Sequence, residues 1–124
     1  MDWTDIYPRK KGFYWAISIV GTIAIFKRSG KTGLWGFGGD AIDVKKISFW
    51  GEKVEIPEEG WSKNEPVEEG WYAVTYDDKT KSIVRVAIGT VLHCYDYEIP
   101  SEIDMRKIVS WNGPLKVPSP PAKK

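Results

Sequence analysis

A G-K-T triplet at positions 30–32 is the pattern in this chain that comes nearest to a phosphate-binding loop. The full signature places a glycine five residues before the G-K pair and begins a helix directly after it. Ile25 occupies the required glycine position, and the glycine-bounded segment 33–36 follows the triplet. We therefore expect a hairpin turn, whose exposed backbone N–H groups could still hold a phosphate passively.

The neighbouring residues His93 and Cys94 are the pair that could indicate nucleophilic catalysis. Such catalysis needs the histidine within hydrogen-bonding reach of the thiol. The surrounding residues 90–95 favour a strand, and successive side chains of a strand point to opposite faces. One His and one Cys are also too few for a zinc site. We expect one core and one surface side chain, with no catalytic or metal-binding role.

Six glutamates are concentrated around the middle of the chain. Acid–base catalysis needs two carboxylates at a fixed separation in a cleft, with pKa values driven apart. A linker rich in proline and glutamate is more often simply solvated. The sequence therefore predicts no catalytic residue and no cofactor, and it favours a binding protein over an enzyme. The glutamates are Glu55, Glu58, Glu59, Glu65, Glu68 and Glu69.

The two halves of the chain resemble each other. One alignment matches a tryptophan, a proline, a glycine and an aromatic pair, and after a three-residue insertion the residues 42–47 match 103–108. Because tryptophan is rare, chance explains these matches poorly. We predict tandem repeats at 1–59 and 60–118, followed by an extended tail at 119–124. The matched pairs include Trp3/Trp61, Pro8/Pro66, Gly12/Gly70, Phe13/Trp71, Tyr14/Tyr72 and Trp50/Trp111.

Each predicted repeat contains short strands separated by turns. A helical turn, capped by Asp40 in the first repeat and by Ser101 in the second, precedes a last strand that holds Trp50 or Trp111. A unit of three or four strands has an apolar face that it cannot bury alone. We therefore predict a mainly β fold, either a β-sandwich or a curled antiparallel sheet, in which two tandem β-rich repeats form one compact domain with one or two short helical turns. The other strands expected from aromatic and β-branched residues are 13–19, 22–27, 34–37, 71–76, 82–88 and 90–95.

Charge and composition exclude some functions. The chain has 18 Lys and Arg against 17 Asp and Glu, a net charge of +1, which argues against general nucleic-acid binding. The single cysteine cannot form a disulfide within the chain, which fits the cytoplasm. No signal-peptide pattern stands at the N-terminus, and the apolar stretch 13–26 is too short and interrupted to span a membrane. We expect a soluble, cytoplasmic protein.

Aromatic and cationic residues that differ between the repeats are the candidates for a binding surface. Aromatic planes stack on bases, and arginine holds phosphate in a fork. Arg85 lies within the otherwise apolar strand at 83–87, where its charge needs either a carboxylate or a ligand as partner. Tryptophans at matched positions are first explained by core packing. The predicted ligand-binding residues are Arg85, Arg28, Lys31, Trp35, Trp71 and Arg106.

The second repeat resembles a small uncharacterised domain of bacteriophages and prophages. That domain has a leading Trp, a P-x-x-G turn, a Y-x-V strand and a closing W-x-x-L-P-x-P-P tail. This chain departs from the pattern in having P-x-x-x-G and two extra residues near its end. The resemblance implies a phage or mobile-element accessory protein and transfers no catalytic residue. It is carried by Trp61, Pro66, Gly70, Tyr72, Val74, Trp111, Leu115, Pro118, Pro120 and Pro121.

Two functions follow as hypotheses. In the first, a non-enzymatic binding protein of phage or mobile-element origin counteracts host defence by sequestering a small nucleotide second messenger, through an aromatic and arginine-lined pocket. In the second, a protein–protein inhibitor or assembly module blocks a host defence protein through an exposed apolar or charged face. Both act in the host cytoplasm, without a membrane, and allow a homo-oligomer. The step from phage accessory protein to anti-defence protein is an analogy.

Overall fold

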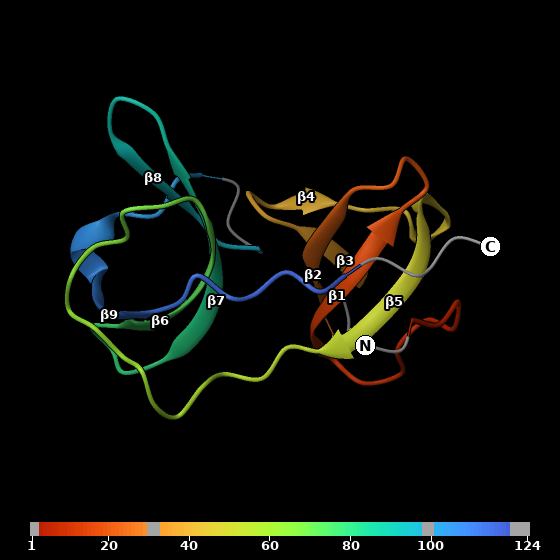
Figure 1. The fold of residues 1–124 in the computed structure, drawn as a ribbon, viewed down its shortest axis with the longest axis horizontal. Coiled ribbons are helices and arrows are strands. Elements are labelled where there is room, and N and C mark those ends of the chain that lie inside the picture. The colour runs from red at the N-terminus through yellow and green to blue at the C-terminus, as the bar shows by residue number, and fades with distance from the viewer. Residues whose placement is uncertain (1–2, 30–32, 98–100, 120–124) are drawn as a thin grey trace. The chain divides into compact units, whose positions relative to one another are not determined.

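A computed structural model describes residues 3–29, 33–97 and 101–119. Their strands form two antiparallel sheets, one of five strands and one of four, and their helices are two short 3-10 turns. The prediction of a mainly β fold with short helical turns is therefore confirmed. One sheet comes from the red-to-yellow half of the chain and the other from the green-to-blue half (Figure 1). None of the helices described is long and apolar enough to cross a membrane.

The chain divides into two compact units. The first unit comprises residues 1–36, 41–55 and those from 117 onward, and the second comprises 37–40 and 56–116. Residues 117–119 thus belong with the first unit, although they follow the second in sequence. That the predicted repeats form one compact domain stays a prediction.

The sheet of the first unit has the strand order β4-β3-β2-β1-β5. Its first hairpin turns sharply at Gly21, where φ is +88°, a conformation that glycine adopts without steric cost. The Thr22 carbonyl accepts a hydrogen bond from the Ser18 N–H at 2.9 Å and closes this turn. The strands are β1 (Gly12–Ser18), β2 (Ile23–Ser29), β3 (Gly33–Gly36), β4 (Asp40–Ala41) and β5 (Ile47–Lys53).

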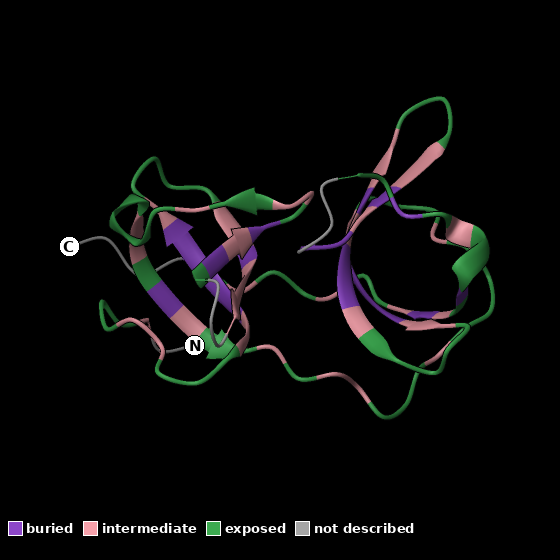
Figure 2. Ribbon diagram, turned by 180° about the vertical axis from the view of Figure 1, so that it is seen from behind, coloured by how far each residue is buried: buried purple, intermediate pink, exposed green. Residues whose placement is uncertain are grey.

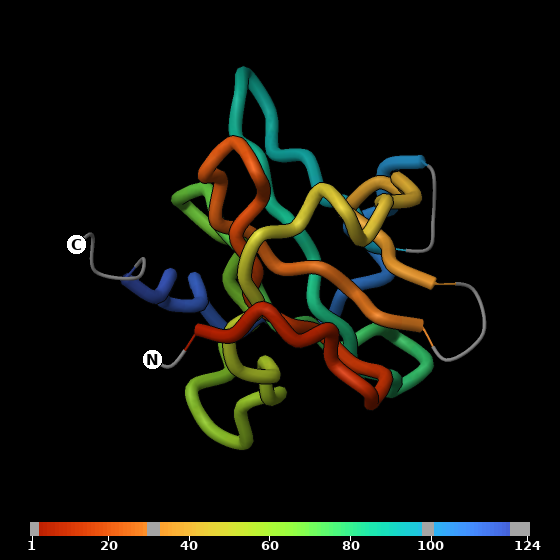
Figure 3. The backbone as a smooth tube through the Cα atoms, turned by 90° about the vertical axis from the view of Figure 1, so that its right-hand side faces the viewer, coloured from red at the N-terminus to blue at the C-terminus, as the bar shows by residue number. Residues whose placement is uncertain are grey.

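The sheet of the second unit has the order β8-β7-β6-β9. At the β6–β7 turn, Thr80 donates hydrogen bonds from its backbone N–H and its hydroxyl to the Asp78 carboxylate, at 3.0 and 2.6 Å. The β7–β8 hairpin projects beyond the body of its sheet in two perpendicular views (Figures 1 and 3). The strands are β6 (Gly70–Tyr76), β7 (Lys81–Ile88), β8 (Leu92–Tyr95) and β9 (Ile108–Asn112).

Each 3-10 turn has an aspartate cap, but not the cap that we predicted. Asp43 caps η1 (Val44–Lys46), and Asp104 caps η2 (Met105–Lys107). Each carboxylate accepts a hydrogen bond from the backbone N–H two residues later, at 3.0 Å. Asp40 and Ser101 were wrong as caps because they precede these turns by at least three residues, and a capping side chain reaches only the first N–H groups of its own helix.

One buried cluster of the first unit lies on one face of its sheet. Tyr14 and Ala16 alternate along β1 and pack with Leu34 and Trp50, all buried. Trp15, on the opposite face of β1, is also buried, at 5% exposed, and the middle of β1 is coloured as buried in Figure 2. Both faces of this strand therefore carry buried side chains, which explains its nearly continuous apolar sequence.

The core of the second unit is larger. Its buried cluster is centred on Val74, Val84 and Val86, none of which has exposed surface. Tyr72 packs edge-on against Trp111, with 6.2 Å between ring centroids and 89° between planes. Core packing was expected for the four matched tryptophans; Trp50 and Trp111 are buried, at 2% and 4% exposed, whereas Trp3 and Trp61 are half-buried.

The two units use corresponding backbone hydrogen bonds. Thr4 and Trp50 exchange a pair of bonds at 2.9 and 2.6 Å, and Ser62 and Trp111 exchange a pair at 2.8 and 2.7 Å. The hydroxyl of Tyr14 donates to a carbonyl four residues earlier at 2.9 Å, and the hydroxyl of its sequence match in the second unit does the same at 2.8 Å. These bonds fall at positions that the sequence alignment pairs, and the duplication itself stays a prediction.

Candidate functional site

Arg85 and Trp71, two of the predicted ligand-binding residues, lie side by side in the second unit. Arg85 on β7 is directly opposite Trp71 on β6 and Tyr95 on β8. Directly opposite side chains project to the same face of a sheet. The guanidinium carbon lies 4.5 Å from the centroid of the Trp71 ring, within the range of a cation–π interaction. The sheet therefore holds an arginine between two aromatic residues.

The charge of Arg85 has no carboxylate partner in the part of the chain that the structure describes. Its Nη1 donates one long hydrogen bond, 3.3 Å, to the Val86 carbonyl. The ion pairs recorded for the described residues join other groups, His93 with Glu102 and Arg106 with Asp104. A guanidinium carries five N–H donors. Most of the donor capacity of this half-buried side chain is thus unused.

Two buried polar residues, Asp96 and Tyr97, directly follow Tyr95, which is the partner of Arg85 on β8. Burial raises the pKa of Tyr97 well above its usual range, and a hydrogen bond with Trp71 and the nearby positive charge of Arg85 offset part of this shift. The buried Asp96 accepts hydrogen bonds from the Tyr76 hydroxyl and the Tyr97 backbone N–H, both at 2.6 Å. Burial, followed by the bond to Asp96, raises the pKa of Tyr76 above its ordinary 10. The hydroxyls of Tyr76 and Tyr97 therefore stay protonated at physiological pH.

The first unit carries a related arrangement. Lys27 on β2 is directly opposite Phe13 on β1 and Trp35 on β3. Its Nζ lies 5.5 Å from the centroid of the Phe13 ring. The predicted residue Trp35 therefore accompanies a lysine, whose compact ammonium lacks the planar fork of arginine.

The other predicted residues lie elsewhere. Arg28 belongs to the sheet of the first unit, with its guanidinium carbon 5.0 Å from the Tyr7 ring centroid. Arg106 pairs with Asp104 through two bonds of 2.9 and 3.1 Å on an almost fully exposed side chain. Lys31 lies outside the described residues. Of the five predicted residues that the structure describes, it therefore brings together two, Arg85 and Trp71.

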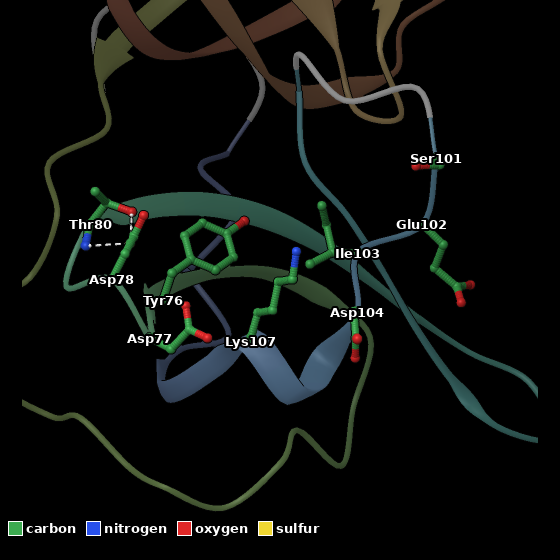
Figure 4. A pocket seen from close by; sticks show the side chains of 9 residues that line it. All are labelled: Tyr76, Asp77, Asp78, Thr80, Ser101, Glu102, Ile103, Asp104 and Lys107. Carbon is green, nitrogen blue, oxygen red and sulfur yellow. Dashed lines mark hydrogen bonds between the residues drawn. The ribbon is translucent and has the colours of Figure 1, made fainter.

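An acidic pocket of about 540 Å³ opens beside the β6–β7 turn (Figure 4). The Tyr76 ring and the Lys107 side chain extend next to each other in this view, while the Glu102 carboxylate points away from the ring. Four carboxylates and one lysine line it, so it attracts cations and repels phosphate. The described residues contain no His, Cys, Asp and Glu group suited to a metal ion. The lining comprises Tyr76, Asp77, Asp78, Thr80, Ser101, Glu102, Ile103, Asp104 and Lys107.

His93 and Cys94 point to opposite faces of β8, as adjacent residues of a strand must. The Cys94 thiol is fully buried in the core, and burial raises its pKa to about 12. His93 instead forms a hydrogen bond through Nδ1 with the Glu102 carboxylate. The thiol is therefore protonated at neutral pH, and the neighbouring His93 is directed away from it.

A second pocket, of about 310 Å³, lies over Trp111 and Tyr72 in the second unit. The segment that borders it belongs to the loop between β5 and β6, drawn in yellow-green in Figure 3. The sequence alone does not predict this pocket, because its wall includes glutamates that we expected to be simply solvated. The sequence feature that could have indicated it is Glu65, which stands where the alignment of the repeats has the aromatic Tyr7.

The chain was compared with family models, with curated proteins and with solved structures, and no match was found.

Proposed function

We propose that this chain is a non-enzymatic binding protein that captures an anionic small ligand, of the class to which nucleotide phosphates belong, at Arg85. The observation that carries this proposal is the half-buried guanidinium without a carboxylate partner among the described residues. A charge removed from water needs a partner, and for Arg85 that partner is either a carboxylate or a ligand. No carboxylate of the described residues forms an ion pair with Arg85, which favours a ligand as its partner.

The surroundings of Arg85 define what the ligand would contact. A phosphate or carboxylate would take the N–H donors of the guanidinium fork that the Val86 carbonyl leaves unused. Trp71 is 8% exposed, so its ring orients the guanidinium and is too buried to stack broadly on a base. Tyr95 is half-buried and is the better stacking surface, with the Phe37 ring centroid 6.1 Å from its own. Arg85 would supply the charge and Tyr95 the aromatic contact.

The proposed origin of the protein rests on the sequence resemblance to a phage domain. Matched hydrogen bonds at Thr4/Trp50 and Ser62/Trp111 support a duplicated unit. A phage or mobile-element protein of this kind would act in the host cytoplasm and would reduce the concentration of a nucleotide signal by binding it. The protonated, buried Cys94 and the glutamate-bound His93 support a role without catalysis.

Thermal melting with a panel of ligands tests the proposal. The panel contains inorganic phosphate and cyclic and linear nucleotides, each measured with the wild type, Arg85→Gln and the exposed-arginine control Arg9→Gln. A ligand at 100 times its Kd stabilises the native state by about 2.7 kcal/mol, a rise in Tm of several degrees. We expect such a rise in the wild type and Arg9→Gln and its loss in Arg85→Gln. No rise with any panel member, or an equal rise in Arg85→Gln, would refute the proposal.

The second candidate function, a module that blocks another protein, is favoured by the pocket over Trp111. Beside it, Val67 is 92% exposed, and Glu65 and Glu68 are exposed as well. An exposed apolar side chain at the mouth of a pocket, with charges around it, is typical of a surface that receives a partner's side chain.

A further inference from the structure

In the first unit, an aromatic side chain covers the core tryptophan. The Tyr7 ring packs against Trp50 at 5.2 Å between centroids and 61° between planes, an edge-to-face contact. The backbone that presents Tyr7 is fixed three residues earlier, by the paired hydrogen bonds between Thr4 and Trp50. The guanidinium of Arg28 lies over the Tyr7 ring, with its carbon 5.0 Å from the ring centroid.

In the second unit, a pocket lies over Trp111, at the place that corresponds to the Tyr7 ring in the first unit. Ser62 forms the equivalent hydrogen-bond pair with Trp111, and three residues later the chain carries Glu65 where the first unit carries Tyr7. The Glu65 side chain is exposed, and the pocket of about 310 Å³ lies over Trp111 and Tyr72. This volume is at the lower end for ligand sites, which suits one ring better than a whole nucleotide.

The walls of the pocket combine apolar and acidic groups. Pro66 and Pro114 supply rigid apolar surface, and Glu65 and Glu68 supply negative charge. Neither glutamate forms an ion pair among the described residues. The aligned positions in the first unit are Tyr7 and Lys10, so the first unit has a ring and a positive charge where the second has two negative charges.

We propose that the pocket over Trp111 is a docking site for an aromatic side chain within a basic segment of a partner protein. The first unit shows the mode of binding within one chain: a ring edge-on to the tryptophan, with a cation over the ring. In the second unit the partner supplies the ring, and its Lys or Arg residues face Glu65 and Glu68. This site is independent of the anion site at Arg85.

Peptide titration with the full chain tests the proposal. The probes are two synthetic peptides of equal charge, each with four arginines, one with a central tyrosine and one with a central alanine. Isothermal titration should give at least tenfold tighter binding for the tyrosine peptide. Equal affinities would show that charge alone drives binding, and no binding of the tyrosine peptide would show that the pocket is not a docking site. Either result overturns the proposal without any variant.

The variant Glu65→Tyr provides the second arm. Its ring should fill the pocket as Tyr7 fills the corresponding place, so the tyrosine peptide should bind at least tenfold more weakly while Tm is unchanged or higher. Glu65→Gln, the matched control, removes only the charge and should weaken binding severalfold. Undiminished peptide binding by a folded Glu65→Tyr protein would overturn the proposal. A nucleotide-induced rise in Tm should persist in Glu65→Tyr, so failure at this pocket is distinguishable from failure at Arg85.

Discussion

At the same register of the two sheets, the first unit places Lys27 opposite Phe13, and the second places Arg85 opposite Trp71. Each cation lies over the ring of its aromatic partner, at 5.5 Å and 4.5 Å respectively. The same strand pairing therefore places a cationic side chain beside an aromatic ring in both units. The side chain at that place decides its chemistry, because guanidinium recognises phosphate with two parallel bonds and ammonium acts as a point charge.

At a second position of the strand register, the two units differ more strongly in the residue that they carry. Arg28 lies opposite Gly12 and Val86 lies opposite Gly70, so the two residues occupy the same register. Val86 is fully buried, whereas Arg28 is half-buried with its Nε buried and without a hydrogen-bond partner. At this register the first unit has a guanidinium beside the Tyr7 ring, and the second unit has a buried hydrocarbon side chain.

The largest expected effect comes from removing the paired core tryptophans. Trp50→Ala and Trp111→Ala should each lower the free energy of unfolding by about 3–5 kcal/mol, because each deletes a buried aromatic ring and leaves a cavity. Urea denaturation followed by circular dichroism measures both. If one variant lost less than about 1 kcal/mol of unfolding free energy while the other lost about 3–5 kcal/mol, the two tryptophan positions would not be equivalent.

Exchanging Arg28 and Val86, which share a register position, should change the free energy of unfolding by unequal amounts in the two units. Val86→Arg should cost about 3 kcal/mol or more, since it buries a charge without a partner. Arg28→Val should change stability by no more than about 1 kcal/mol, because it also removes an unsatisfied buried donor. Both free energies come from the same denaturation experiment. Similar losses in the two variants would contradict the difference between the units.

The smallest expected effect is a pH dependence at the caps. A hydrogen bond from Arg106 lowers the pKa of Asp104 below its ordinary 3.8. A lowered pKa in the folded state adds stability above pH 3.8, and this stability is lost as pH falls through the lowered pKa. Between pH 5 and pH 2, the Tm of Arg106→Ala should therefore fall slightly less than that of the wild type. The matched variant Lys45→Ala, beside the cap Asp43, should follow the wild type, because the ion pairs recorded for the described residues join neither Lys45 nor Asp43. A steeper fall in Arg106→Ala would contradict this assignment.

Much of the strand layout was predictable from sequence, because short aromatic and β-branched runs ended at glycines and polar turns. The runs at 71–76 and 82–88 match β6 and β7 closely. The cap residues were wrong because Asp40, Asp43, Ser101 and Asp104 are all good capping types, and only backbone geometry distinguishes those that begin the turn.

Less of the candidate site was predictable. Arg85 stood out because a charge interrupted an apolar strand, but the strand register that pairs it with Trp71 depends on the position of the turn. The pocket over Trp111 was hidden, since an absent ring leaves no motif in a sequence. The contrast between Tyr7 and Glu65 gained meaning only when matched hydrogen bonds placed both on the same backbone.

The most direct test of the account is the ligand-induced rise in Tm, measured in parallel on Arg85→Gln and Lys27→Gln. These variants remove the matched cations of the two units with the same substitution. The account predicts that an anionic ligand which stabilises the wild type no longer stabilises Arg85→Gln and still stabilises Lys27→Gln. A rise that persists in Arg85→Gln, or that disappears only in Lys27→Gln, would contradict the assignment of anion capture to the second unit.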